Sequence, residues 1–166
     1  MPEKKTIEKA LRAKRSGKAP STQAGAFVEE EIDHIRAGKH GARSTKQAIA
    51  IGLAKARRAG VKLAPPKKGT TSSKTRKQAA ADTHRGQATR KTPISSRRSR
   101  ASEKALQHEG HGAASHASLA RQARTSAKKR SAAARAASAK KAARTRQAAR
   151  RKRRALQAPS QRSRGW

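Results

Sequence analysis

The distribution of charge is the feature that most constrains what this chain can fold into. Residues 113–166 carry 17 Lys and Arg and no Asp or Glu, whereas residues 1–64 carry 15 cations and 6 anions and residues 65–112 carry 12 and 3. A segment whose charges all have one sign cannot form internal ion pairs, and it repels itself when it is compact. The C-terminal third is therefore excluded from an ordinary globular fold. The net charge of the 166 residues is +35.

The apolar residues allow only one modest core. The hydrophobic residues comprise 37 Ala and 17 larger side chains, and most of those 17 precede Pro65. Because burial of large apolar side chains offsets the conformational entropy lost on folding, the sequence predicts one small folded domain over residues 1–64. The chain has no Cys, which excludes disulfides and thiolate metal sites. No apolar run approaches the roughly 20 residues that span a bilayer, so we expect a soluble, cytoplasmic protein without a membrane partner.

Helix signals are clear in the predicted domain. The spacing of apolar residues predicts helices at about 7–14, 22–37 and 45–59, which together make a small helical hairpin or three-helix unit in a mostly α chain. The sequence places these side chains on the inner faces of the three helices: Ile7 and Leu11 in the first, Phe27, Val28, Ile32 and Ile35 in the second, and Ile49, Leu53 and Ala56 in the third.

Local capping signals mark both ends of the third helix. Ser44 and Gln47 form a capping box, in which the Ser hydroxyl accepts from the Gln amide N–H and the Gln side chain returns to the Ser amide. Gly60 is placed as the left-handed residue after the helix, and Val61 behind it can make the apolar contact of a Schellman motif. These signals predict a helix that ends near Ala59.

The rest of the chain is basic and poor in large apolar side chains. Residues 65–112 open with two Pro and continue in Ser, Thr, Lys and Arg, which predicts a disordered basic linker. Residues 113–158 contain neither Gly nor Pro, and their Ala, Arg, Lys and Gln favour a long helix, whereas repulsion between like charges favours a disordered tail. We expect partial helix in free solution and more helix on a polyanion. A disordered C-terminus is predicted at 159–166.

The tail residues are the candidate nucleic-acid-binding residues. Duplex DNA presents a phosphate charge per roughly 1.7 Å of axis. Each phosphate that the protein neutralises changes the slope of the logarithm of the binding constant against the logarithm of the salt concentration by about −0.9. If about ten tail cations engage phosphates, the slope of binding against salt approaches about −9. The predicted binding residues are Arg121, Arg124, Lys128, Lys129, Arg130, Arg135, Lys140, Lys141, Arg144, Arg146, Arg150, Arg151, Lys152, Arg153 and Arg154.

Sequence-specific recognition has weaker support in the sequence. The helix at 45–59 is the candidate recognition helix, although cations near a helix C-terminus also favour the helix dipole. Its polar candidates are Lys46, Gln47, Lys55, Arg57 and Arg58. The sequence lacks the set of exposed aromatic side chains on which single-stranded RNA bases stack. Its aromatic residues are Phe27, expected in the core, and Trp166, the last residue.

Two further groups contain residue types that occur in metal or catalytic sites. Ion pairing with neighbouring helices is the favoured interpretation of the acidic cluster Glu29, Glu30, Glu31 and Asp33. Another group, His108, His111 and His116, lacks the i, i+4 spacing of zinc-protease helices and is interrupted by Gly. The sequence therefore predicts no catalytic residue, no cofactor and no metal ligand.

Three segments of the N-terminal region resemble a known group of proteins. They are Ser21 to Ile32, Gly38 to Leu53 and Lys55 to Gly60. They resemble small basic bacterial proteins of undefined function that carry labels such as DNA-binding or plasmid stabilisation protein, over about residues 1–68. The tail is similar in composition to the Ala/Lys/Arg-rich tails of linker histones and bacterial histone-like proteins. The resemblance implies nucleic-acid condensation.

These features lead to one main hypothesis and two alternatives. The main hypothesis is a non-enzymatic, nucleoid-associated protein that binds DNA with little sequence dependence through its basic tail. The first alternative is an RNA-binding or ribosome-associated basic protein. The second makes the N-terminal helices a protein-interaction module, in a plasmid-maintenance or stress system, with the tail as an anchor. The apolar stripe of the helices could also be the seam of a homodimer.

Overall fold

The computed structural model describes residues 2–88 and 95–157, apart from the side chain of Lys152. Over these residues the chain is helical and contains no strand, which confirms the expected mostly α class. The elements are α1 (Lys4–Arg15), α2 (Pro20–Arg36), α3 (Thr45–Arg58), α4 (Ser73–Gln87), α5 (Ser96–Gln107), the short 3-10 helix η1 (Gly112–Ala114), α6 (His116–Lys128) and α7 (Ala132–Gln157). They belong to two compact units, Met1–Gln122 and Ala123–Trp166.

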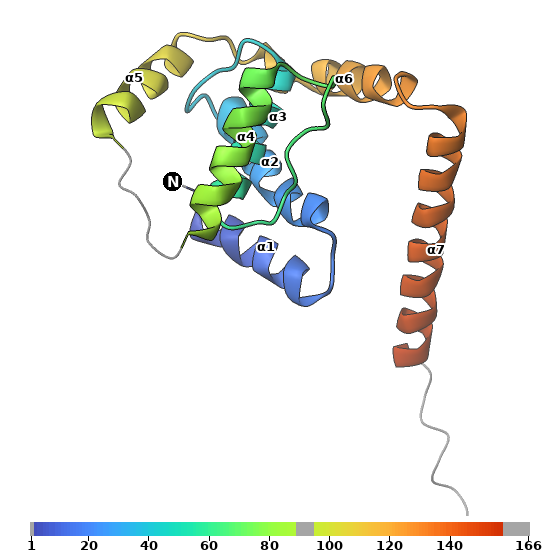
Figure 1. The fold of residues 1–166 in the computed structure, drawn as a ribbon. Helices are drawn as coiled ribbons and strands as arrows, with labels where there is room; N and C mark the ends of the chain where they lie inside the picture. The colour runs from blue at the N-terminus through green and yellow to red at the C-terminus, as the bar shows by residue number, and fades with distance from the viewer. Residues whose placement is uncertain (1, 89–94, 158–166) are drawn as a thin grey trace, which may run out of the picture. The chain divides into compact units, whose positions relative to one another are not determined.

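The first unit is built around α2 and α3. Helix α2 packs against α1 on one side and α3 on another, and α4 packs against α3 (Figure 1). Its core has two parts. One contains Ala10, Ala24, Phe27, Ala56 and Val61, and the other contains Ile32, Ile35, Ala42, Ala48 and Ala114. The predicted inner face of α2 is confirmed, because its large apolar residues are buried or half-buried.

Helix α1 begins at Lys4, three residues before the predicted start. The ends of α2 and α3 follow the local signals with two differences. Helix α2 starts at Pro20, two residues before the predicted start, because the fixed φ of Pro suits the first helical position. Ser44 caps α3 by accepting a 3.2 Å hydrogen bond from the Gln47 amide, as predicted, but the Gln47 side chain accepts from the Arg43 amide rather than from Ser44. Gly60 has φ +90°, as a Schellman stop requires.

The buried face of α1 is displaced by one residue from the predicted stripe, and that of α3 is displaced at two of its three predicted positions, whereas Ala56 is buried as predicted. In α1 the buried residues are Thr6 and Ala10, whereas Ile7 and Leu11 are 37% and 47% exposed. In α3 the seam consists of Ala48, Gly52 and Ala56, beside half-buried Ile49 and Leu53. Small side chains let the backbones of α2 and α3 approach closely, since an added Cβ at Gly52 would lie 2.7 Å from Val28 Cα. The large apolar residues then pack along the edges of the seam.

The expected disordered linker at 65–112 is a wrong prediction over most of its length. Ser72 caps α4 by accepting from the Thr75 amide at 3.2 Å, and the helix buries Ala79 and Asp82. The Thr83 hydroxyl donates to the Leu63 carbonyl at 3.2 Å, which ties α4 to the segment after α3. A helix without large apolar residues is not expected to dock, but α4 docks through Ala, Gly and hydrogen-bonded polar groups.

The expected boundary between linker and tail at 112/113 also needs correction. The hydroxyl of Thr45 donates to the Ala113 carbonyl at 2.7 Å, and Arg36 Nε donates to the Ala114 carbonyl at 3.0 Å. Ala114 is fully buried in the second part of the core, with Leu119 packed against it. The first unit therefore extends through Gln122, and the basic tail is a second unit. The predicted disordered C-terminus at 159–166 lies outside the described residues.

The tail is also not one continuous helix. Helix α6 ends at Lys128, and α7 begins at Ala132 after Ser131, whose hydroxyl accepts from the Ala134 amide at 3.2 Å. Because Ser offers the backbone this alternative partner, it starts a new helix rather than continuing the first.

Candidate nucleic-acid interface

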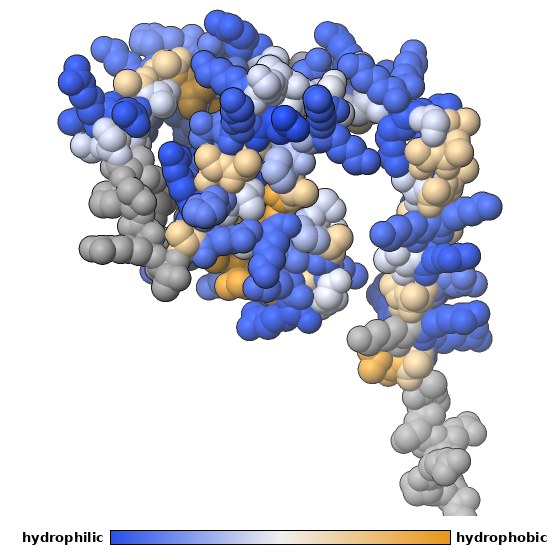
Figure 2. Space-filling model, in the orientation of Figure 1, coloured by the Kyte–Doolittle hydropathy of each residue, from blue (hydrophilic) through white to orange (hydrophobic). Residues whose placement is uncertain are grey.

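Helix α7 carries the densest positive charge of the described residues. It has 26 residues, among them ten Lys and Arg and no Asp or Glu, over a length of about 39 Å at about 1.5 Å per residue. All its described side chains are exposed except the half-buried Ala134. Figure 2 shows hydrophilic side chains projecting from this helix between more apolar patches. The structure is helical over Ala132–Gln157 and presents an exposed array of cations there.

The cations of α7 surround the helix rather than forming one stripe. Successive helical residues are about 100° apart, so the run 150–154 alone passes through a full turn. Its members are Arg150, Arg151, Lys152, Arg153 and Arg154, and the earlier cations are Arg135, Lys140, Lys141, Arg144 and Arg146. A helix charged on all sides has no apolar face that could pack into a protein core. Such a helix is suited to contact with a polyanion on any side.

The remaining predicted binding residues lie before α7. Arg121, Arg124 and Lys128 are exposed on α6, and Lys129 and Arg130 are exposed in the turn that follows. The guanidinium of Arg130 donates to the Ala134 carbonyl at 3.1 Å and to the Ser138 hydroxyl, which holds it against the first turns of α7. Arg121 belongs to the first unit, whereas the others belong to the second.

The candidate recognition helix is occupied with contacts inside the first unit. The Gln47 side chain accepts from the Arg43 amide at 3.0 Å, the ammonium Nζ of Lys55 lies 2.6 Å from Glu31 Oε2, and Arg58 pairs with Asp82 at 3.9 Å. Arg57 is only 6% exposed, and it donates to the carbonyls of Leu63 at 3.4 Å and Ala64 at 3.3 Å.

Burial lowers the pKa of Arg57, and the nearby charge of Asp82 acts in the opposite direction. Among the contacts described for the five polar candidates of α3, Lys46 alone has no hydrogen bond or ion pair within the first unit, and its side chain is exposed. The structure therefore assigns α3 to packing within the unit rather than to reading base edges.

The acidic cluster of α2 divides between two faces of the helix. Glu29 is exposed and pairs with Lys9 of α1, and Asp33 is exposed on the same side. Glu30 is buried and accepts from the Glu3 amide, while Glu31 is buried and pairs with Lys55. The predicted ion pairing with neighbouring helices is confirmed for Glu29 and Glu31.

A second cluster, which the sequence argument missed, surrounds Glu31. Glu31, His34 and His40 are close enough that one ligand atom from each lies within 4.8 Å of the others, and they are the one such group among residues 2–88 and 95–157. The Nε2 atom of His34 lies 2.8 Å from Glu3 Oε1. Hydrogen bonds from His34 and Lys39 hold the pKa of Glu3 below its ordinary value. The Glu-Ile-Asp-His spacing in α2 was the available sequence signal.

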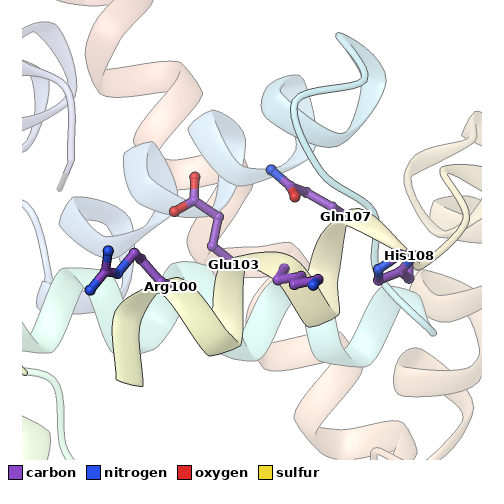
Figure 3. Close-up of a pocket in the computed structure, with 5 residues that line it drawn as sticks. Arg100, Glu103, Gln107 and His108 are labelled. Atoms are coloured by element: carbon purple, nitrogen blue, oxygen red, sulfur yellow. The ribbon is translucent and has the colours of Figure 1, made fainter. Parts of the chain in front are cut away.

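The histidines His108, His111 and His116 are exposed and are not brought together as a metal site. The adjacent surface of α5 has a depression of about 560 Å³ lined by Arg100, Glu103, Lys104, Gln107 and His108 (Figure 3). Because all five come from one helix and the residue after it, no second element closes over the depression. It does not have the enclosed form of a substrate pocket.

The comparisons with known proteins identify no relative. The chain matches no protein family, and neither a curated protein nor a solved structure shows significant similarity to it. Within the described part of the chain, each helix is too short or too polar to cross a bilayer.

Proposed function

We propose that the protein binds duplex DNA with little dependence on sequence and organises it as a non-enzymatic, nucleoid-associated protein of the cytoplasm. The observation that carries this proposal is α7, in which ten cations and no anion are presented around a helix of about 39 Å. The second unit supplies cations without any anion, and the first unit is a compact helical domain attached to it.

The electrostatics of α7 match a duplex well. Along about 39 Å of its axis, duplex DNA presents about 23 phosphate charges, so each of the ten cations has a partner within reach. Engagement of all ten releases enough condensed counterion for a log–log salt slope of about −9. Binding of this kind is strong at low salt and falls steeply as salt is added.

The shape of α7 favours B-form DNA over duplex RNA. An α-helix with its side chains is about 10–12 Å across, which fits the major groove of B-DNA, about 12 Å wide. The major groove of A-form RNA is too narrow and deep for such a helix. Between its cations α7 presents Ala methyl groups, which allow close approach but provide no hydrogen bonds to base edges. This combination supports affinity without specificity.

The test measures the salt dependence of binding by the full chain and by two charge variants. The tail variant replaces Arg150, Arg151, Lys152, Arg153 and Arg154 with Gln. The matched control replaces Lys74, Lys77, Arg97, Arg98 and Arg100 with Gln, which are five exposed cations of α4 and α5. Each is titrated with salt against equal lengths of duplex DNA, single-stranded DNA and duplex RNA by fluorescence anisotropy.

The tail variant is expected to lose about 4 to 5 units of salt slope on duplex DNA, because five phosphate contacts at about 0.9 each disappear. The control is expected to lose less than about 1 unit. Equal losses in both variants would overturn the assignment of binding to the tail. Tighter binding of duplex RNA than duplex DNA at the same salt would overturn the choice of DNA.

A further inference from the structure

The buried carboxylate of Glu31 is the starting point for an inference separate from DNA binding. Its side chain is completely buried, and neither carboxylate oxygen accepts a hydrogen bond within the described structure. Lys55 Nζ lies 2.6 Å from Oε2 and balances the charge, but without hydrogen-bond geometry. Oε1 faces His40 Nε2 at 3.5 Å. Burial of a carboxylate oxygen without a hydrogen bond costs free energy. The site can therefore accept a further group that takes an electron pair from oxygen, such as a metal cation.

The hydrogen bonds of His40 determine which of its ring nitrogens faces Glu31 with a lone pair. Nδ1 lies 3.2 Å from the Gly41 carbonyl, which can only accept, so Nδ1 carries the hydrogen. In the neutral ring Nε2 is then an acceptor, and it faces the acceptor Oε1. Two facing lone pairs repel each other unless a proton or a metal cation lies between them.

His34 is oriented in the same way by a carboxylate. Its Nε2 donates to Glu3 Oε1 at 2.8 Å, which leaves Nδ1 as the electron-pair donor. Metal-binding histidines almost always donate their second ring nitrogen to a carboxylate or carbonyl, which fixes the ring and raises its basicity. His34 and His40 both have such a partner. The rings are held 6.1 Å apart between centroids, nearly perpendicular to each other.

We propose that Glu31, His34 and His40 bind a divalent transition-metal ion, with Zn²⁺ as the best match. Two imidazoles and one carboxylate form a donor set suited to Zn²⁺, and the absence of Cys from the chain rules out a thiolate site. Ligand atoms around one Zn²⁺ lie about 3.4 Å apart, given bonds of about 2.0–2.1 Å, and one possible ligand atom from each of the three residues already lies within 4.8 Å of the other two.

The consequence of binding is a clamp on the connection between α2 and α3. Glu31 and His34 lie one turn apart on α2, whereas His40 comes from the loop that precedes α3. An ion that joins them holds this loop to α2 and stabilises the first unit by mass action. Glu3 brings the residue before α1 to the same place through its contact with His34. Metal binding thus links α1, α2 and the loop without involving the basic tail.

The experiment measures Zn²⁺ binding to the full chain by isothermal titration calorimetry, without nucleic acid, together with the thermal unfolding midpoint. The proposal expects one high-affinity equivalent and a rise of several degrees in the midpoint with Zn²⁺. His34→Gln and His40→Gln are each expected to abolish that equivalent and the rise. The matched control carries His108→Gln and His111→Gln, two exposed histidines that should leave both unchanged.

A second variant keeps the proposal testable if a histidine substitution disturbs folding. Lys55→Met removes the competing cation at Glu31 and is expected to lower the midpoint without metal and to enlarge the rise caused by Zn²⁺. The proposal is overturned if Zn²⁺ does not bind at concentrations up to about 0.1 mM, or if the bound equivalent survives in the His34→Gln, His40→Gln double variant. Loss of the equivalent in the His108, His111 control would assign it to the Gly-rich histidines instead.

Discussion

Arg57 shows how the role of a basic residue in this chain depends on where its charge lies. The chain has 44 Lys and Arg, and most of the described ones are exposed. Arg57 is instead 6% exposed, and its guanidinium donates to two carbonyls of the segment after α3. A guanidinium keeps its charge when buried, and its fork of donors can satisfy several carbonyls at once. Arg57 therefore stabilises the fold rather than contributing to the basic surface.

This assignment predicts different effects for two cations of the same helix. Arg57→Ala is expected to lower the free energy of unfolding by about 2–3 kcal/mol, because it leaves a cavity and unpaired carbonyls. Lys46→Ala, on the exposed side of α3, is expected to change it by less than about 0.5 kcal/mol. Urea denaturation followed by circular dichroism measures both. Equal stability of the two variants would contradict a structural role for Arg57.

At the scale of the elements, the first unit is assembled by small residues at helix crossings. The seam of α3 is Ala48, Gly52 and Ala56, and α1 buries Thr6 and Ala10 against α2. Helix α4 meets the end of α3 in the same way, since an added Cβ at Gly86 would lie 1.9 Å from the Arg57 carbonyl oxygen. Close approach of helices increases the contacts made by backbone and Cβ atoms, and it compensates in part for the shortage of large apolar residues.

The crossing of α2 and α3 can be tested with two Gly→Ala substitutions. Gly52→Ala is expected to destabilise the chain by about 1–3 kcal/mol, because the new methyl group overlaps the backbone of Val28. Gly25→Ala is expected to stabilise it by up to about 1 kcal/mol, because Gly25 is exposed in α2, has nothing within 4 Å of an added Cβ, and Ala favours helix. The midpoints of thermal unfolding of the two variants, compared with that of the unchanged chain, test both expectations. The same sign for both would mean that the helices do not cross closely at Gly52.

At the scale of the whole molecule, a basic tail is attached to a folded domain, and this domain extends well past the apolar-rich residues 1–64. The first unit continues through Gln122, because η1 and the start of α6 complete the second part of its core. The second unit contains no Asp or Glu. The two units therefore differ in the residues that they contain: the first has the apolar and paired groups that packing requires, whereas the second has exposed cations.

The boundary between the units predicts the effect of two truncations. A chain that ends after Gln122 is expected to keep the unfolding free energy of the first unit within about 0.5 kcal/mol, at salt that screens the tail. A chain that ends after Gly110 is expected to lose about 2–3 kcal/mol, because two hydrogen bonds and the packing of Ala114 and Leu119 disappear. Urea denaturation compares them with the full chain. A stable chain ending at Gly110 would place the boundary earlier.

Several features of this protein could be predicted from the sequence because they depend on neighbours along the chain. The cap at Ser44, the left-handed Gly60 and the inner face of α2 each follow from residues within one or two helical turns. The segregation of charge is a property of the sequence itself, so an exposed cationic segment could be predicted, although composition favours a helix there and charge repulsion favours a disordered tail.

Only the tertiary structure decided the features that depend on residues far apart in the chain. The one-residue displacement of the buried face in α1, and of the positions predicted for Ile49 and Leu53 in α3, arises because backbones approach where side chains are smallest. The periodicity of large apolar residues does not indicate this. The docking of α4 depends on Asp82, Thr83 and Gly86 meeting the end of α3. The cluster of Glu31, His34 and His40 needs the loop before α3 to return to α2, while Lys55 approaches from α3. Composition and local spacing determine which segments can be helical, whereas long-range contacts select the faces that are buried and the polar groups that meet.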